Sequence, residues 1–81
     1  MIYVTDTHSL VWFLANDSKL GKDALSAFRS ADEGKALIVV PAIVIAEVLY
    51  IAEKRGAGAQ LGALLKKLEE SANYIVYNLN L

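Results

Sequence analysis

The chain has 81 residues, no cysteine, and nine acidic side chains against eight basic ones, for a formal net charge of −1. This length allows one domain at most, and the near balance of charge excludes a strong overall field that would draw the chain to nucleic acid or to an anionic membrane. The lack of cysteine excludes a disulfide framework and a thiolate metal site, which leaves a hard cation as the metal to expect.

Membrane insertion and secretion find no support in the sequence. No uncharged run exceeds 11 residues, and the most apolar of them, residues 36–46, is interrupted by Pro41, whereas a membrane-spanning helix needs about 20. No basic segment followed by an apolar stretch opens the chain, so a secretory signal is not visible. We expect a cytoplasmic protein.

The first part of the chain predicts one strand followed by two helices. Residues 2–5 are β-branched and aromatic, as in a short strand, and residues 7–16 change to helical spacing. An amphipathic helix is predicted over residues 19–33, with Asp17 or Ser18 as N-cap and Gly34 as its end. Strand gives way to helix at Asp6.

The rest of the chain repeats this order and ends in a third strand. Residues 37–40 form a continuous apolar run, typical of a strand covered on both faces, and a helix is predicted from Ala42 to about Arg55. A further helix is expected over residues 60–72 and a strand over residues 74–77. The order β-α-α-β-α-α-β predicts an α/β fold, a three-layer α/β/α arrangement on a parallel sheet of three strands with about four helices.

Two acidic residues stand out against this background. Asp6 closes the first strand, and Glu47 is the only charged residue in the stretch 42–52. A carboxylate in apolar surroundings loses hydration unless a cation, a proton or hydrogen bonds compensate. No basic residue lies three or four positions from Glu47, so we expect its side chain to point into a cleft.

Each acid also has a purely structural interpretation. Asp6 could be the N-cap of the following helix, and Glu47 could be a partly buried glutamate bonded to a group elsewhere. Because open parallel sheets place ligands at the carboxyl ends of their strands, the predicted topology brings both acids to one edge. There they would suit Mg²⁺ or Mn²⁺. Two acids alone do not distinguish a nuclease from a phosphatase or a structural cation site.

Three segments carry a family resemblance: residues 2–14 (IYVTDTHSLVWFL), residues 39–41 (VVP) and residues 45–48 (IAEV). Together they resemble the N-terminal half of PIN domains, most closely the VapC-like toxin branch. The resemblance implies a metal-dependent endoribonuclease in which Asp6 and Glu47 hold Mg²⁺ or Mn²⁺ against an RNA phosphodiester, and in which the hydroxyl of Thr7 helps to order the site. It also implies a VapB-like antitoxin as partner.

The chain departs from the family pattern after its third strand. The third and fourth acids of PIN domains have no counterpart here, so we expect residues 1–81 to form a single PIN-like domain that lacks the C-terminal part of the fold. Its first strand would then be an open edge, which favours self-association as a homodimer or higher oligomer. The alternative function is a catalytically silent fragment that acts only through self-association or partner binding.

Other residues and classes receive weaker support. His8, the only histidine, and the aromatic pair Trp12 and Phe13 are expected to be structural rather than ligands or base-stacking groups. Phosphoryl transfer of the haloacid-dehalogenase kind would require an aspartate where His8 stands. A dinucleotide-binding fold would require a glycine-rich turn after the first strand, which is absent from the sequence.

Overall fold

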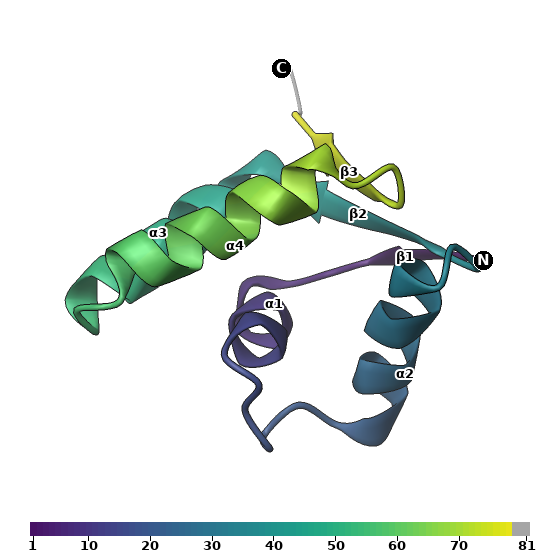
Figure 1. Ribbon diagram of the computed structural model, residues 1–81, viewed down its shortest axis with the longest axis horizontal. Coiled ribbons are helices and arrows are strands. Elements are labelled where there is room, and N and C mark those ends of the chain that lie inside the picture. The colour runs from purple at the N-terminus through teal and green to yellow at the C-terminus, as the bar shows by residue number, and fades with distance from the viewer. Residues whose placement is uncertain (79–81) are drawn as a thin grey trace.

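The structure is a computed structural model that describes residues 1–78. Its elements alternate strand, two helices, strand, two helices and strand (Figure 1). They are β1 (Ile2–Val4), α1 (Thr7–Leu14), α2 (Lys22–Asp32), β2 (Leu37–Pro41), α3 (Ala42–Lys54), α4 (Gly58–Glu70) and β3 (Tyr74–Tyr77). The element order predicted from the sequence is confirmed.

The three strands form one parallel sheet with β2 at its centre. Ile2 pairs with Leu37 and Val4 with Val39 on one side of β2, while Val39 pairs with Ile75 on the other. Pro41 can end the strand because α3 begins at the next residue, where the backbone no longer needs a ladder hydrogen bond. β1 and β3 are therefore the two edges of the sheet in the described part of the chain.

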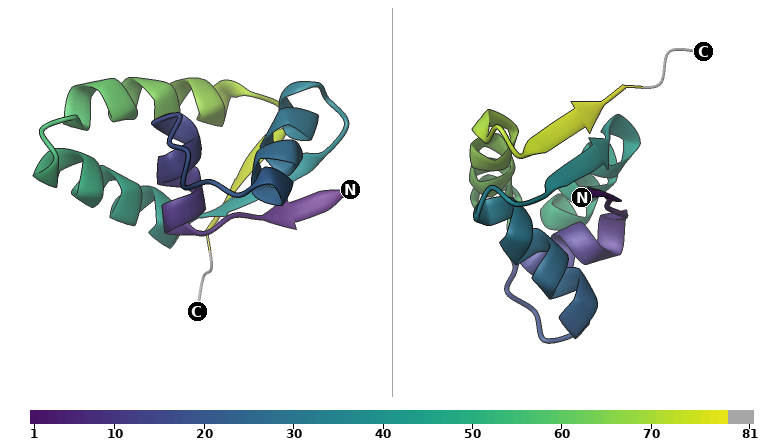
Figure 2. Two further views of the ribbon diagram at one scale, coloured as in Figure 1. Left: turned by 90° about the horizontal axis from the view of Figure 1, so that it is seen from below. Right: turned by 90° about the vertical axis from the view of Figure 1, so that its right-hand side faces the viewer.

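All four helices contribute to one hydrophobic core on a single face of this sheet, as the two views of Figure 2 show. Ile38 and Val40 of β2 point into this core and are 1% and 0% exposed. The arrangement follows from handedness, because two right-handed crossovers that step in the same direction along a sheet lie on the same face. The core draws on each helix, through Leu10, Val11, Phe28, Ala31, Val44, Val48, Leu65 and Leu68.

The opposite face of the sheet has no helix over it among residues 1–78. We call it the bare sheet face; it consists of Ile2, Val4, Leu37, Val39, Ile75 and Tyr77. Ile2 and Val4 are 67% and 70% exposed, and Ile75 and Tyr77 are 45% and 53% exposed. The predicted α/β fold with three parallel strands and four helices is thus confirmed. The described residues build one helical layer on this sheet, whereas the sequence predicted two.

Helix limits differ from the predicted ones by up to three residues. α2 begins at Lys22 with Gly21 as its N-cap, so the prediction of Asp17 or Ser18 as N-cap is wrong. Asp17 instead accepts a hydrogen bond from the backbone N–H of Lys19 at 2.9 Å, which stabilises a turn before the helix. Gly34, predicted as the end of this helix, has φ +77°, a left-handed conformation that glycine adopts without strain.

A partly buried hydrogen bond fixes β3 against the helices. The hydroxyl of Tyr74, a residue that is 6% exposed, donates to Oδ1 of Asp32 at the end of α2 over 2.9 Å. Burial and the neighbouring carboxylate raise the pKa of Tyr74 above its usual value. The last strand is thereby attached to an element 42 residues earlier in the chain.

Within the described residues, none of the helices combines the length and the apolar character that a membrane crossing requires.

Candidate metal centre at the carboxyl ends of β1 and β2

Asp6 lies between the carboxyl end of β1 and the start of α1, and it is the N-cap of that helix. Its backbone is extended (φ −102°, ψ 174°), and its Oδ1 accepts a hydrogen bond from the backbone N–H of Ser9 at 2.9 Å. The structural interpretation of Asp6 is therefore correct. This hydrogen bond engages one carboxylate oxygen of Asp6, Oδ1.

Thr7 follows Asp6 in the chain and contacts Glu47. Its hydroxyl donates to Oε1 of Glu47 over 3.0 Å, across 40 positions of sequence, and the residue itself is only 8% exposed. Thr7 is the first residue of α1, directly after Asp6, whereas Glu47 lies in the second turn of α3. The contact brings the carboxylate of Glu47 to the strand end at which Asp6 sits, as the predicted topology requires.

The expectation that Glu47 points into a cleft is wrong. Both Glu47 and Asp6 are exposed, and Glu47 lines none of the five main pockets of the described residues. The reason is the narrow buried stripe of α3, which consists of Val44, Val48 and Ala52. Glu47 lies about 60° from Val44 around the helix, at the border of that stripe, so the apolar residues around it in sequence do not enclose it.

Neither acid is neutralised by a basic side chain in residues 1–78. The single ion pair of this region joins Lys35 and Glu33, far along the chain from both acids. The hydrogen bonds from Ser9 hold the pKa of Asp6 below its usual value, with a smaller contribution from His8, so Asp6 is ionised at neutral pH. Its carboxylate therefore remains available to a cation from solution.

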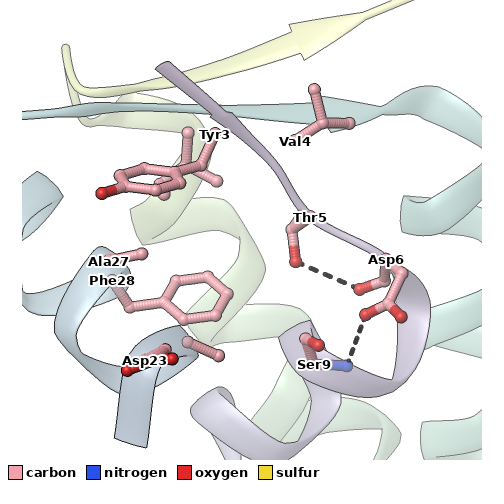
Figure 3. A pocket seen from close by; sticks show the side chains of 10 residues that line it. Tyr3, Val4, Thr5, Asp6, Ser9, Asp23, Ala27 and Phe28 are labelled. Atoms are coloured by element: carbon pink, nitrogen blue, oxygen red, sulfur yellow. Dashed lines mark hydrogen bonds between the residues drawn. The ribbon is translucent and has the colours of Figure 1, made fainter. Parts of the chain in front are cut away.

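A pocket of about 400 Å³ opens beside Asp6 between β1 and α2 (Figure 3). Asp6 and Ser9 lie at one end of it, and Asp23 of α2 adds a second carboxylate to its lining. The remaining wall is largely apolar and comes from β1, β2 and α2, through Tyr3, Val4, Thr5, Ala24, Ala27, Phe28 and Ile38. Sequence reasoning missed Asp23, because a single aspartate in the first turn of a helix is common.

The donor set suits a weakly held hard cation. Asp6 and Glu47 together offer carboxylate oxygens at one strand end, and Mg²⁺ is commonly bound through one or two carboxylates while it keeps several waters. No group of three or more acidic, histidine or cysteine side chains placed to hold a metal occurs among residues 1–78. The residues present thus fit a divalent ion with few protein ligands.

The comparison with family models decides the fold family. The model described as the PIN domain matches residues 3–79 of the chain. The chain belongs to the PIN domain family. Members of this family are generally nucleases, so the match supports a nuclease kind of activity for this PIN domain. No curated protein and no solved structure matches the chain. The prediction that the C-terminal part of the fold is missing stays a prediction.

The other residues considered in the sequence, His8, Trp12 and Phe13, lie close to further aromatic rings. Phe13 stacks on Phe28 with ring centroids 4.3 Å apart and packs against the core, as expected. Trp12 also packs against the core, while its ring lies 5.9 Å from that of His8, which is exposed. None of these aromatic rings lines the pocket beside Asp6 except that of Phe28.

Proposed function

We propose that this PIN domain is a metal-dependent endoribonuclease of the VapC toxin type, with Asp6 and Glu47 as ligands of one Mg²⁺ or Mn²⁺ ion. The observation that carries the proposal is the hydrogen bond from Thr7 to Glu47, because it draws a carboxylate 40 positions away to the strand end that carries Asp6. The family match supports the nuclease kind. Cytoplasmic location and a VapB-like antitoxin as partner belong to the same proposal.

The negative charge of the two acids means that RNA cleavage at this site requires a cation. A phosphodiester approaching two ionised carboxylates meets repulsion of like charges, and no lysine or arginine within residues 1–78 forms an ion pair with either acid. A divalent ion between the acids and the phosphate would reverse the sign of this interaction. When bound, such an ion supplies an activated water and neutralises charge that develops on the phosphate.

Three side chains of the site would each have a defined role in holding the ion. Asp6 would present Oδ2, because Oδ1 is engaged by the N–H of Ser9. Glu47 would present Oε2, because Oε1 accepts the hydrogen bond from Thr7. Thr7 acts as a positioning residue: it is buried, and its hydroxyl restricts the carboxylate of an exposed helix position to one orientation.

Self-association also belongs to the proposal. The bare sheet face carries no charged residue and exposes four large apolar side chains by 45% or more, those of Ile2, Val4, Ile75 and Tyr77. Parallel sheets occur almost only with both faces covered. A homodimer or higher oligomer would cover this face.

The activity is tested with a fluorescent single-stranded RNA incubated with Mg²⁺ or Mn²⁺. We expect cleavage by the native chain, its loss on chelation, and a fall of about 100-fold or more in the Asp6→Asn and Glu47→Gln variants. Asn is as good an N-cap as Asp, so Asp6→Asn should leave α1 intact. Glu53→Gln, also an exposed glutamate of α3, is the matched control and should cleave normally.

The alternative function is a catalytically silent PIN domain that acts by binding alone. One observation favours it: within the described residues, no three acidic, histidine or cysteine side chains are placed to hold one metal ion. Cleavage that persists in both acid variants, or no metal-dependent cleavage by the native chain at protein concentrations well above those of the RNA, would support this alternative and reject the nuclease proposal.

A further inference from the structure

α3 carries an exposed aromatic ring one turn after Glu47. Tyr50 is 61% exposed and lies three positions after Glu47 in the same helix. At about 100° and 1.5 Å per residue, this spacing places Tyr50 about 60° from Glu47 around the helix and about 4.5 Å further along its axis. Tyr50 is therefore on the side of α3 that carries the proposed metal ligand.

A lysine accompanies this ring. Nζ of Lys54 lies over the ring of Tyr50, 5.2 Å from its centroid. Lys54 is exposed, and it stands seven positions after Glu47, about 20° from it around the helix. Within residues 1–78 the ion pair joins Lys35 to Glu33, so Lys54 is not engaged by a carboxylate there. A carboxylate, an aromatic ring and a free ammonium group thus follow one another along one side of α3.

This side of α3 begins at the candidate metal centre. The hydrogen bond from Thr7 holds the carboxylate of Glu47 at the strand end that carries Asp6. Tyr50 and Lys54 lie in the following turns, in the part of the molecule where α3 and α4 extend beyond the carboxyl ends of the strands (Figure 1, Figure 2). The three side chains span about 10.5 Å along the helix axis.

The two groups beyond Glu47 match the two parts of an unpaired nucleotide. Proteins that bind single-stranded nucleic acid stack bases on aromatic side chains and contact the phosphates with basic ones. The exposed ring of Tyr50 offers the stacking surface, and Lys54 offers the cation. A base within a duplex is already stacked on its neighbours, so a nucleotide bound in this way has to be unpaired.

Structural roles explain this pair of residues less well. The dipole of a helix favours a lysine in the last turn, which accounts for Lys54. It does not account for Tyr50, which belongs neither to the hydrophobic core nor to the partly buried residues packed against that core. An aromatic side chain contributes to stability mainly through its burial, so a ring that is 61% exposed contributes little.

A second copy of this chain is the other occupant to consider for this side of α3, because Ile43 is also exposed there, by 67%. A helix packed along this side would cover the carboxylate of Glu47 as well. The proposed function requires that carboxylate to stay open to an ion and a phosphate. The charge of Lys54 is, in addition, complementary to a phosphate. Both arguments favour RNA as the occupant.

We propose that Tyr50 and Lys54 form a nucleotide-binding subsite beside the candidate metal centre, in which the base of one unpaired nucleotide stacks on the ring of Tyr50 and the ammonium group of Lys54 contacts its phosphate. The subsite restricts the substrate to RNA that is single-stranded at this position. The inference rests on the proposed function, because it takes RNA as the substrate and Glu47 as a metal ligand.

The first test measures binding apart from cleavage. A fluorescent single-stranded RNA of about ten nucleotides is titrated with the native chain at low salt in the presence of a chelator, and its anisotropy gives the affinity. Tyr50→Ala should weaken binding by about tenfold, whereas Tyr50→Phe, which retains a stacking ring, should stay within about twofold of the native chain. An unchanged circular dichroism spectrum shows that each variant is folded.

The contact of Lys54 with a phosphate is tested by the salt dependence of the same affinity. Lys54→Gln should reduce the slope of log affinity against log salt concentration by about 0.7, the value for one phosphate contact on a single strand. Lys66→Gln, which changes an exposed lysine of α4, is the matched control and should leave the slope unchanged.

A set of RNAs that each lack one base separates stacking from a general loss of affinity. We expect one position at which removal of the base weakens binding to the native chain by about tenfold and leaves binding to Tyr50→Ala unchanged, because the two changes remove the same contact. With Mn²⁺ present, Tyr50→Ala should raise KM by about tenfold and leave kcat within about twofold. A native chain that shows this base dependence but no metal-dependent cleavage would reject the nuclease proposal and support the subsite.

Three results would each overturn the subsite: equal RNA affinity of the native chain and Tyr50→Ala, no position whose base dependence is lost in Tyr50→Ala, or a salt slope that Lys54→Gln leaves unchanged. An oligomer of the native chain that dissociates in Tyr50→Ala while RNA affinity is retained would also overturn it. A second copy would then be the occupant of this side of α3.

Discussion

At the residue scale, the candidate site depends on one hydroxyl. Thr7 is buried, and its hydroxyl is the described group that orients the carboxylate of Glu47. Thr7→Val keeps the shape and removes the donor, so metal-dependent RNA cleavage should fall by about 10- to 100-fold, the range observed for partners that orient metal ligands. Thr7→Ser, which restores a hydroxyl, should recover most of the cleavage rate. Equal rates for the Val and Ser variants would contradict the positioning role.

Asp6 also gives the stability of the chain a pH dependence with a definite sign. The pKa of Asp6 is lowered in the folded state, chiefly by its hydrogen bonds with Ser9. The stabilisation that ionised Asp6 provides is therefore complete above its unfolded pKa of about 3.9, and it is lost as pH falls through the folded pKa. Asn at this position caps α1 without titrating.

The free energy of unfolding should therefore decline more steeply below about pH 4 in the native chain than in Asp6→Asn. Urea unfolding of both proteins between pH 2 and 6 measures this, with ~1 kcal/mol as the scale of an N-cap. Parallel curves for the two proteins would show that the Asp6 cap does not contribute to stability.

At the element scale, the strands, the order of the helices and the starts of α1 and α3 followed from sequence patterns, while the starts of α2 and α4 and the exposure of Glu47 did not. The apolar run 37–40 and the segment 74–77 specify strands locally through β-branched and aromatic residues. The N-cap of α2 was missed because Asp17 forms its side-chain hydrogen bond within a turn, and Gly21 caps the helix without one. The exposure of Glu47 was missed because the apolar character of α3 extends beyond the stripe that is buried.

The start of α2 can be improved by a substitution. Gly21 has φ −66°, a conformation open to any residue, and a Cβ placed there meets no atom within 4 Å. Gly21→Ser should raise the free energy of unfolding by about 0.5–1 kcal/mol, through a side-chain cap and a less flexible unfolded chain. Gly34→Ser is the control: at φ +77° it should destabilise by about 1 kcal/mol. Urea unfolding measures both, and a loss of stability in Gly21→Ser would contradict this description of the helix start.

At the scale of the whole molecule, the asymmetry of the sheet underlies the proposed self-association. The helices cover one face, and the bare sheet face carries exposed apolar residues of β1 and β3 and half-buried ones of β2. The double variant Val39→Thr with Ile75→Thr should shift sedimentation equilibrium toward the monomer and change the free energy of unfolding by less than about 1 kcal/mol, because threonine retains the β preference.

Val40→Thr is the matched control, since Val40 adjoins Val39 but is 0% exposed on the covered face. It should destabilise by about 1–3 kcal/mol through the buried hydroxyl. Self-association that is unchanged in the double variant would show that the bare sheet face is not the surface through which copies meet.

The convergence of Asp6 and Glu47 on one divalent ion is tested most directly by titrating Mn²⁺ into the isotope-labelled chain and following the broadening of its amide NMR signals. We expect signals around both acids to broaden together with one midpoint, to sharpen again when Mg²⁺ competes, and to lose their broadening at both places in Glu47→Gln but not in Glu53→Gln. Broadening near one acid alone, or broadening around Asp6 that Glu47→Gln leaves unchanged, would contradict a shared site.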